Sequence, residues 1–120
     1  MDAFRPVQNR KLVHNGTSVL WTRQLLSEQG IGGIVLVRAQ VLDAAAQMVT
    51  TEFWHVTCVA QNHDGLITGA VIPLLTTPAL TSVSGLAFVL EATGTFFVIR
   101  ATAAATVGYK VLLTFGIVEM

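Results

Sequence analysis

The sequence predicts an all-β chain, folded as an antiparallel β-sandwich of the jelly-roll type with seven or eight strands. Apolar and polar residues alternate with a period of two over most of the chain, which is typical of strands. Glycine, proline and pairs such as Asn-Gly and Asp-Gly separate the alternating segments at short intervals. No segment of about ten residues has the 3.6-residue periodicity of an amphipathic helix.

The segment before the sandwich, residues 1–16, is expected to be an extended N-terminal arm, and residues 17–120 are expected to form the domain. The segment is polar, contains Pro6 and ends in the turn signal Asn15-Gly16. We expect the arm to hold a neighbouring protein and contribute little to the core. Its candidate partner-binding residues are Phe4, Arg5, Arg10 and Lys11.

Each strand of the domain is justified by its own alternation. The first strand places Val19, Trp21 and Leu25 on one face, and the third places Trp54 and Val56 together. The turn at residues 62–65 contains an Asp-Gly pair, which tolerates the positive φ of a tight hairpin. The expected strands cover residues 17–25, 35–42, 53–61, 66–75, 83–92, 96–101 and 107–120, and residues 43–48, 76–82 and 102–106 are expected to be loops.

Composition limits the classes of protein that fit the chain. Of its 120 residues, 52% are hydrophobic and 12% are charged, whereas an average soluble domain has about 25% charged residues. The apolar content is enough for one core and excludes disorder. Seven basic residues balance seven acidic ones, which argues against ordinary nucleic-acid binding. The single cysteine, Cys58, excludes an intrachain disulfide framework.

A membrane location is not expected, although residues 65–90 carry no charge. Pro73 and Pro78 would interrupt a helix there, and no signal peptide is visible in residues 1–10. We therefore expect a soluble chain made in the cytosol. Both faces of segments 83–92 and 107–120 are largely apolar, although a sandwich strand needs one buried face. Such apolar surface predicts an obligate homo-oligomer.

Residues able to carry chemistry are few and scattered. His55 and Cys58 point to opposite faces of one strand because their spacing is odd, so they do not form a metal site. Cys58 is expected to be buried, where its thiolate is disfavoured. Gly30-Ile31-Gly32-Gly33 lacks the following helix and lysine of a phosphate-binding loop, and no G-x-S-x-G elbow is present. We assign no catalytic, cofactor-binding or metal-binding residue and expect no cofactor.

A carbohydrate- or receptor-binding module is the alternative from a different class. Trp21, Trp54 and Tyr109 either fill the core or, if exposed, offer a platform on which sugar rings stack. The core is favoured for all three, and least strongly for Trp21. If the alternative holds, the binding residues are Trp21, Asn62, His63 and Asp64.

The order of elements along the chain is similar to that of a known domain. Val98-Ile99-Arg100 is followed by the Thr/Ala-rich loop 102–106, by Tyr109-Lys110-Val111 and by a terminal Val118-Glu119. Upstream, residues 34–44 and 51–60 look like two paired strands. This pattern resembles a jelly-roll-like β-sandwich domain of tailed-bacteriophage virion proteins, found at the C-termini of tail fibres and in small head decoration proteins. The likeness covers residues 17–120.

The resemblance implies a virion structural protein, usually trimeric and without enzymatic activity. Because the arm is short and the domain nearly stands alone, the expected function is a capsid decoration (cement) protein. It would bind the assembled head as a homotrimer and stabilise it by mass action. The expected partners are further copies of the chain and the major capsid protein or another virion protein, with no nucleic acid and no membrane. The alternative is a tail-fibre or appendage module that binds a host receptor or carbohydrate. The expected location is the virion, after synthesis in the host cytoplasm.

Overall fold

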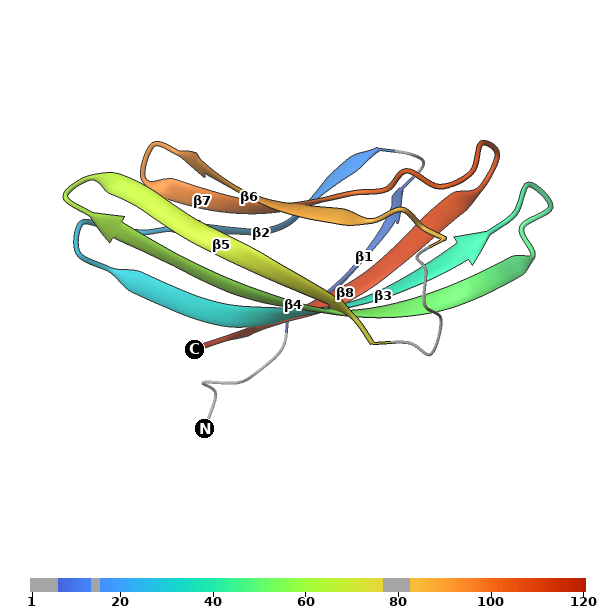
Figure 1. Ribbon diagram of the computed structural model, residues 1–120, viewed down its shortest axis with the longest axis horizontal. Helices are drawn as coiled ribbons and strands as arrows, with labels where there is room; N and C mark the ends of the chain where they lie inside the picture. Colours follow the sequence, from blue (N-terminus) through green and yellow to red (C-terminus); the bar gives the residue numbers. More distant parts are fainter. Residues whose placement is uncertain (1–6, 14–15, 77–82) are drawn as a thin grey trace.

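The computed structural model describes residues 7–13, 16–76 and 83–120, and for residues 7–13 it describes the backbone alone. These residues form eight antiparallel strands in two sheets, which confirms the predicted all-β, sandwich-like class (Figure 1). None of them belongs to a helix that could cross a membrane. The strands are β1 (Val7–Val13), β2 (Thr17–Gln24), β3 (Gly30–Leu42), β4 (Met48–His63), β5 (Leu66–Leu75), β6 (Ala87–Thr93), β7 (Phe96–Thr102) and β8 (Lys110–Glu119).

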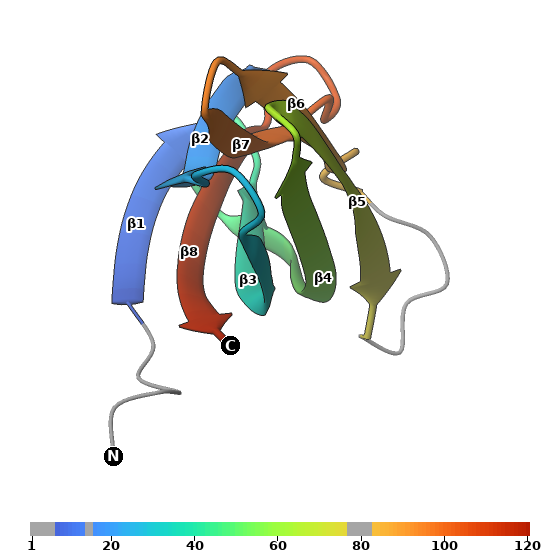
Figure 2. The ribbon, with the colours of Figure 1, turned by 90° about the vertical axis from the view of Figure 1, so that its left-hand side faces the viewer.

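The two sheets have unequal sizes and lie one over the other. Five strands form the larger sheet in the order β1-β8-β3-β4-β5, and β2-β7-β6 form the smaller one. The smaller sheet covers one face of the larger sheet, as both views show (Figures 1 and 2). The larger sheet bends along its strands toward the smaller sheet, so its other face is convex (Figure 1). We call this convex face the outer face.

The core lies between the sheets and follows the predicted alternation. Trp21 of β2 packs edge-on against Phe97 of β7, with ring centroids 5.1 Å apart. This aromatic pair and the aliphatic side chains opposite it remove the largest apolar area from water. The buried aliphatic and aromatic residues of the two central strands are Val35, Val37, Ala39 and Val41 of β3 and Val111, Leu113, Phe115 and Ile117 of β8.

Strand β4 is longer than the predicted segment 53–61, because its pairing with β3 continues from Gly30 opposite Gln61 to Leu42 opposite Met48. The acidic Glu52 occupies an inward position of β4, where the alternation pattern would place an apolar side chain. Because Glu52 breaks the pattern, the sequence did not predict that the strand begins at Met48. Residues 30–34 also pair with β4, so β3 begins five residues before the predicted strand 35–42.

Two predicted strands begin later than expected. Residues 83–86 do not pair in a sheet, because Val83 and Ser84 donate backbone hydrogen bonds to the Glu52 carboxylate and Gly85 has a φ of +64°. Residues 107–109 form a turn in which Gly108 has a φ of +90°. Strands β6 and β8 therefore start at Ala87 and Lys110.

Part of the expected arm forms strand β1, which brings the number of described strands to eight. Strand β1 pairs with β8 along its whole length, from Val7 opposite Ile117 to Val13 opposite Val111. It therefore forms one edge of the larger sheet (Figure 2). The division of the chain into an arm and a domain at residue 16 stays a prediction.

Candidate functional site

Of the four candidate residues of the arm, the structure describes the backbone of two, Arg10 and Lys11. Phe4 and Arg5 lie outside the described residues. Arg10 and Lys11 lie in β1 at the register positions opposite Thr114 and Leu113. Their role in binding a partner stays a prediction.

The candidate carbohydrate residues do not form an exposed aromatic platform. Trp21 is buried against Phe97, so its ring fills the core. Asn62 is also buried, where its Nδ2 donates to the Leu25 carbonyl oxygen at 2.8 Å and its Oδ1 accepts from the Gly65 amide at 3.0 Å. These contacts give Trp21 and Asn62 structural roles.

His63 and Asp64 remain exposed at the β4–β5 turn, but their contacts are local. Both are tied to Glu28: the His63 Nδ1 lies 3.2 Å from Oε2, and the Asp64 amide donates to Oε1 at 2.9 Å. Asp64 has a φ of 55°, as the predicted Asp-Gly turn requires. Asn62, His63 and Glu28 line a small hollow of about 180 Å³ that does not include Trp21.

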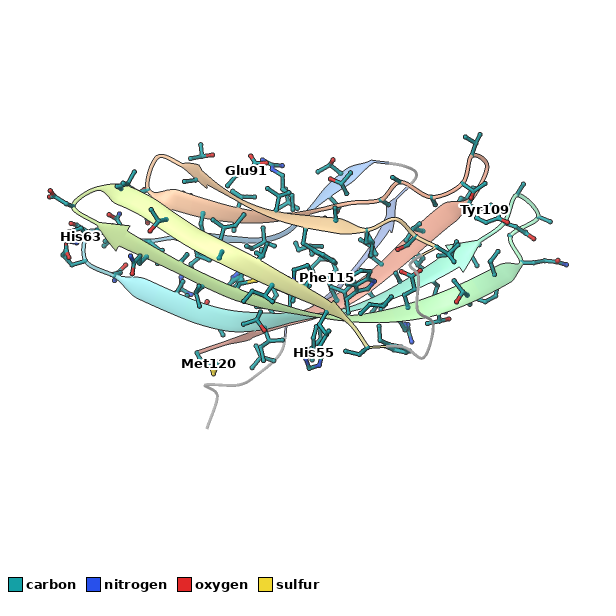
Figure 3. The ribbon with its side chains drawn as sticks, viewed as in Figure 1. His55, His63, Glu91, Tyr109, Phe115 and Met120 are labelled. Atoms are coloured by element: carbon teal, nitrogen blue, oxygen red, sulfur yellow. The ribbon has the colours of Figure 1, made fainter. Side chains whose placement is uncertain are left out.

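His55 and Cys58 lie on opposite faces of β4, which confirms their predicted orientation. Cys58 is buried between the sheets, and its Sγ lies 3.6 Å from the Val56 carbonyl oxygen. Burial raises the pKa of the Cys58 thiol to about 11, so the reactive thiolate is disfavoured at neutral pH. His55 is exposed and points away from the smaller sheet, whereas Phe115 lies between the sheets (Figure 3).

A broad hollow lies on the outer face of the larger sheet, over β3, β4 and β8. Its volume is about 660 Å³, and it is open and shallow. Six side-chain positions on three adjacent strands surround it: Leu36 and Arg38 of β3, Phe53 and His55 of β4, and Thr114 and Gly116 of β8. We call this hollow the outer-face site.

Strand register creates the outer-face site as two neighbouring rows. Arg38 lies between Thr114 and Phe53 in one row. Leu36 lies between Gly116 and His55 in the next row. Side chains two residues apart share a face of a strand, so the six positions are contiguous.

Arg38 is the chemically distinctive residue of the outer-face site. Its Nη2 donates a long hydrogen bond of 3.4 Å to the Thr114 Oγ1. Its Nε is buried and has no hydrogen-bond partner within the described structure. The ion pairs of the described residues join Arg23 to Glu119, His63 to Glu28 and Arg100 to Glu91, and none of them includes Arg38. A guanidinium has five donors, so Arg38 retains capacity for an acceptor from outside.

Aromatic surface lies beside this cation. The Phe53 side chain is 50% exposed, and the backbone of Phe53 pairs with that of Arg38 in β3.

A second hollow, of about 270 Å³, lies further along β4 and β5 and is lined by Val59, Gln61 and Thr68 among others. Along β4, Val59 is about 13 Å from His55 at the usual rise per strand residue. The outer face therefore offers two hollows along one line.

The sequence contained a signal for the outer-face site that alternation alone did not single out. Arg38, Phe53 and His55 lie on the faces of their strands opposite the core, which are normally exposed to solvent. Only the β3–β4 register, with Arg38 opposite Phe53, brings them together.

Apolar side chains are exposed on both sheets. Val89 of β6 is 46% exposed, in the segment where the sequence predicted a second apolar face. Ile72 and Leu74 of β5 are 65% and 60% exposed, and this strand was not predicted to have one. Their exposure agrees with the chain's low charge and leaves the predicted homo-oligomer open to test.

Comparisons with known proteins find a likeness in structure alone. No protein family matches the sequence, and no curated protein is similar to it. The tailspike protein of Acinetobacter baumannii phage AM24 has a TM-score of 0.48 and 14% identity, over 96% of this chain and 26% of that one. Tailspike gp49 of Acinetobacter baumannii bacteriophage Fri1, a capsular polysaccharide depolymerase, has a TM-score of 0.37 and 8% identity, over 93% of this chain and 17% of that one.

Both similar structures are phage tailspikes, and the chain spans about a quarter and a sixth of their lengths. One of them is a polysaccharide depolymerase. This finding contradicts the expectation, drawn from the sequence resemblance, that the protein has no enzymatic activity. We therefore withdraw that exclusion.

Proposed function

We propose that the chain is a module of a bacteriophage tail appendage, carried on the virion, and that it binds a carbohydrate of the host surface at the outer-face site. The observation that supports the proposal is the juxtaposition of an exposed Phe53 ring with the Arg38 guanidinium, His55 and the Thr114 hydroxyl around one open hollow. Sugar rings have apolar faces that stack on aromatic rings and hydroxyl groups that bond to polar side chains.

The outer-face site suits a sugar better than a broad contact with a capsid. A lattice contact of a cement protein needs a large complementary surface, usually above about 1,000 Å². The outer-face site is a local hollow in which polar and aromatic groups converge, as in small-ligand sites. We therefore favour the appendage function over the capsid decoration function expected first from the sequence.

The second hollow extends the proposal to a chain of sugars. It lies on the same face and along the same strand as the outer-face site. A polysaccharide that crosses both hollows gains from two weak contacts held on one rigid sheet. We expect oligosaccharides that span both hollows to bind more tightly than single sugars.

The test is a screen of bacterial surface polysaccharides on a glycan array, followed by calorimetric titration of each positive. Phe53→Ala should weaken binding at least tenfold, because the stacking surface is removed. Phe96→Ala is the matched control, since Phe96 is also partly exposed on a strand but belongs to the smaller sheet. If no glycan binds, or if both variants weaken binding equally, the proposal is wrong.

A further inference from the structure

We propose that the outer-face site recognises an acidic saccharide, with the sugar carboxylate bound by Arg38 and the adjacent ring carbons resting on Phe53. This inference rests on the proposed function and names the chemical class of its ligand. Three features of the described residues support it: the charge of the outer face, the unused donors of Arg38, and the position of the site in the middle of the sheet.

The strand residues of the outer face carry no described acidic side chain. The charged residues that register places on this face are Arg38 of β3 and Lys110 of β8, together with Arg10 of β1, whose register position is opposite Thr114. The described acidic side chains lie elsewhere: Glu52 between the sheets, Glu91 on β6, Glu119 paired with Arg23, and Glu28, Asp43 and Asp64 in connections. A chain with equal numbers of acidic and basic residues therefore presents a locally cationic face.

The Arg38 guanidinium is held in place but not neutralised. Thr114 accepts one hydrogen bond from Nη2, and the buried Nε has no described partner. A carboxylate matches the two parallel donors of a guanidinium fork, and such a bidentate bond is stronger than a neutral one. The half-buried setting of Arg38 also reduces screening by salt and water.

A sugar is favoured over an acidic peptide because of where the site lies in the sheet. Strands β3 and β4 are interior strands whose backbone groups pair with neighbours on both sides. A peptide cannot add to them as a further strand, which is a common mode of peptide binding. Recognition has to come from side chains alone, and a carboxylated ring satisfies the cation and the aromatic surface together.

The experiment compares polysaccharides with their own neutral forms. Bacterial polysaccharides that the array identifies as ligands are titrated before and after chemical reduction of their carboxyl groups to alcohols, which leaves the glycosidic backbone intact. Wild-type protein is compared with Arg38→Gln, which removes the charge, and Arg38→Lys, which keeps the charge but loses the fork. Arg100→Gln is the control for a basic side chain on the smaller sheet, and circular dichroism checks that each variant is folded.

We expect carboxyl reduction to weaken binding to the wild type by about tenfold to a hundredfold. Arg38→Gln should lose a similar factor for the acidic polysaccharide and show no further loss for the reduced one. The affinity of Arg38→Lys should lie between those of the wild type and Arg38→Gln, and Arg100→Gln should bind as the wild type does.

Failures of the two proposals differ. If no polysaccharide binds at all, the proposed function fails and this inference fails with it. If glycans bind but carboxyl reduction leaves affinity unchanged, or if only neutral glycans bind, the carboxylate inference alone is overturned. The inference is also overturned if Arg38→Gln weakens the binding of the acidic and the reduced polysaccharide by the same factor, because Arg38 would then act without the carboxylate. Tight binding of polyglutamate in place of a saccharide would favour an acidic peptide and contradict the inference.

Discussion

Glu52 offers the sharpest test of how the fold is held together. Its carboxylate is fully buried between the sheets and accepts hydrogen bonds at both oxygens. Oε2 accepts from the amides of Val83 at 2.6 Å and Ser84 at 3.0 Å. Oε1 accepts from the Ser84 hydroxyl at 2.6 Å and the Trp54 Nε1 at 3.2 Å. The side chain therefore ties the segment before β6 to the first part of β4.

The perturbation is Glu52→Gln, which keeps the shape but replaces one acceptor oxygen with a donor. The new amide nitrogen destabilises the fold least at the Oε1 position, because the Ser84 hydroxyl can rotate and accept a hydrogen bond from it. The Trp54 Nε1 then loses its hydrogen-bond acceptor. The other three bonds become neutral, at a loss of about 1 kcal/mol each, and removal of a buried charge offsets part of that loss. We expect the free energy of unfolding to fall by about 2 to 4 kcal/mol.

Urea unfolding followed by tryptophan fluorescence measures this change, with the slope used to check two-state behaviour. Glu91→Gln is the matched control, because Glu91 is half exposed and its oxygen lies 3.5 Å from Arg100. That control should change stability by less than about 0.5 kcal/mol. A loss below about 1 kcal/mol for Glu52→Gln would refute the assignment of Glu52 as the anchor of the segment.

Stability should fall between pH 9 and pH 11, because burial raises the pKa of Cys58 from its ordinary value of 9.0 to about 11, so the unfolded chain ionises first. The slope, about 1.4 kcal/mol per pH unit, should shrink in Cys58→Ala when denaturant unfolding is repeated across that range. Gly85→Ala should cost about 2 kcal/mol, because a Cβ there would meet the Ala104 carbonyl oxygen at 2.6 Å with φ at +64°; Gly94→Ala, with a similar φ and open space, should cost clearly less in the same assay. Deletion of residues 1–16 should leave the circular dichroism spectrum of a β protein while weakening attachment to a partner, and an unfolded product would contradict the arm hypothesis. Sedimentation equilibrium should give a mass near three times 12.8 kDa, and a monomer at all concentrations would contradict the predicted homotrimer.

Sequence patterns predicted the fold well where one face of a strand is apolar. The alternation from Val35 to Val41 and from Val111 to Ile117 corresponds to the buried faces of β3 and β8. The pattern failed where a polar side chain takes an inward place, as Glu52 does, because a buried carboxylate looks like a solvent-facing residue in the sequence. It also failed at residues 83–86, where the backbone amides of Val83 and Ser84 donate to the Glu52 side chain instead of pairing with a neighbouring strand.

The outer-face site was harder to predict because its residues are distant in the sequence. Arg38 and Phe53 become neighbours only through the β3–β4 register, and Thr114 joins them through β8. Local motifs directed attention to Asn62, His63 and Asp64, where consecutive polar residues serve the turn. The register between strands decides which side chains become neighbours, and it cannot be read from one sequence alone.

The strand order has a consequence for how the chain acquires its fold. Within the described sheets β1 pairs with β8 and β2 pairs with β7, so each of these strands finds its partner only after the strands between them in the sequence have been made. The meander β3-β4-β5 can form early, but β3 exposes one edge until β8 arrives. Such distant pairings fold slowly and leave unpaired edges open to aggregation. Correct folding therefore depends on the completion of β8, and a version truncated within β8 would leave β1 without its partner and one edge of β3 unpaired.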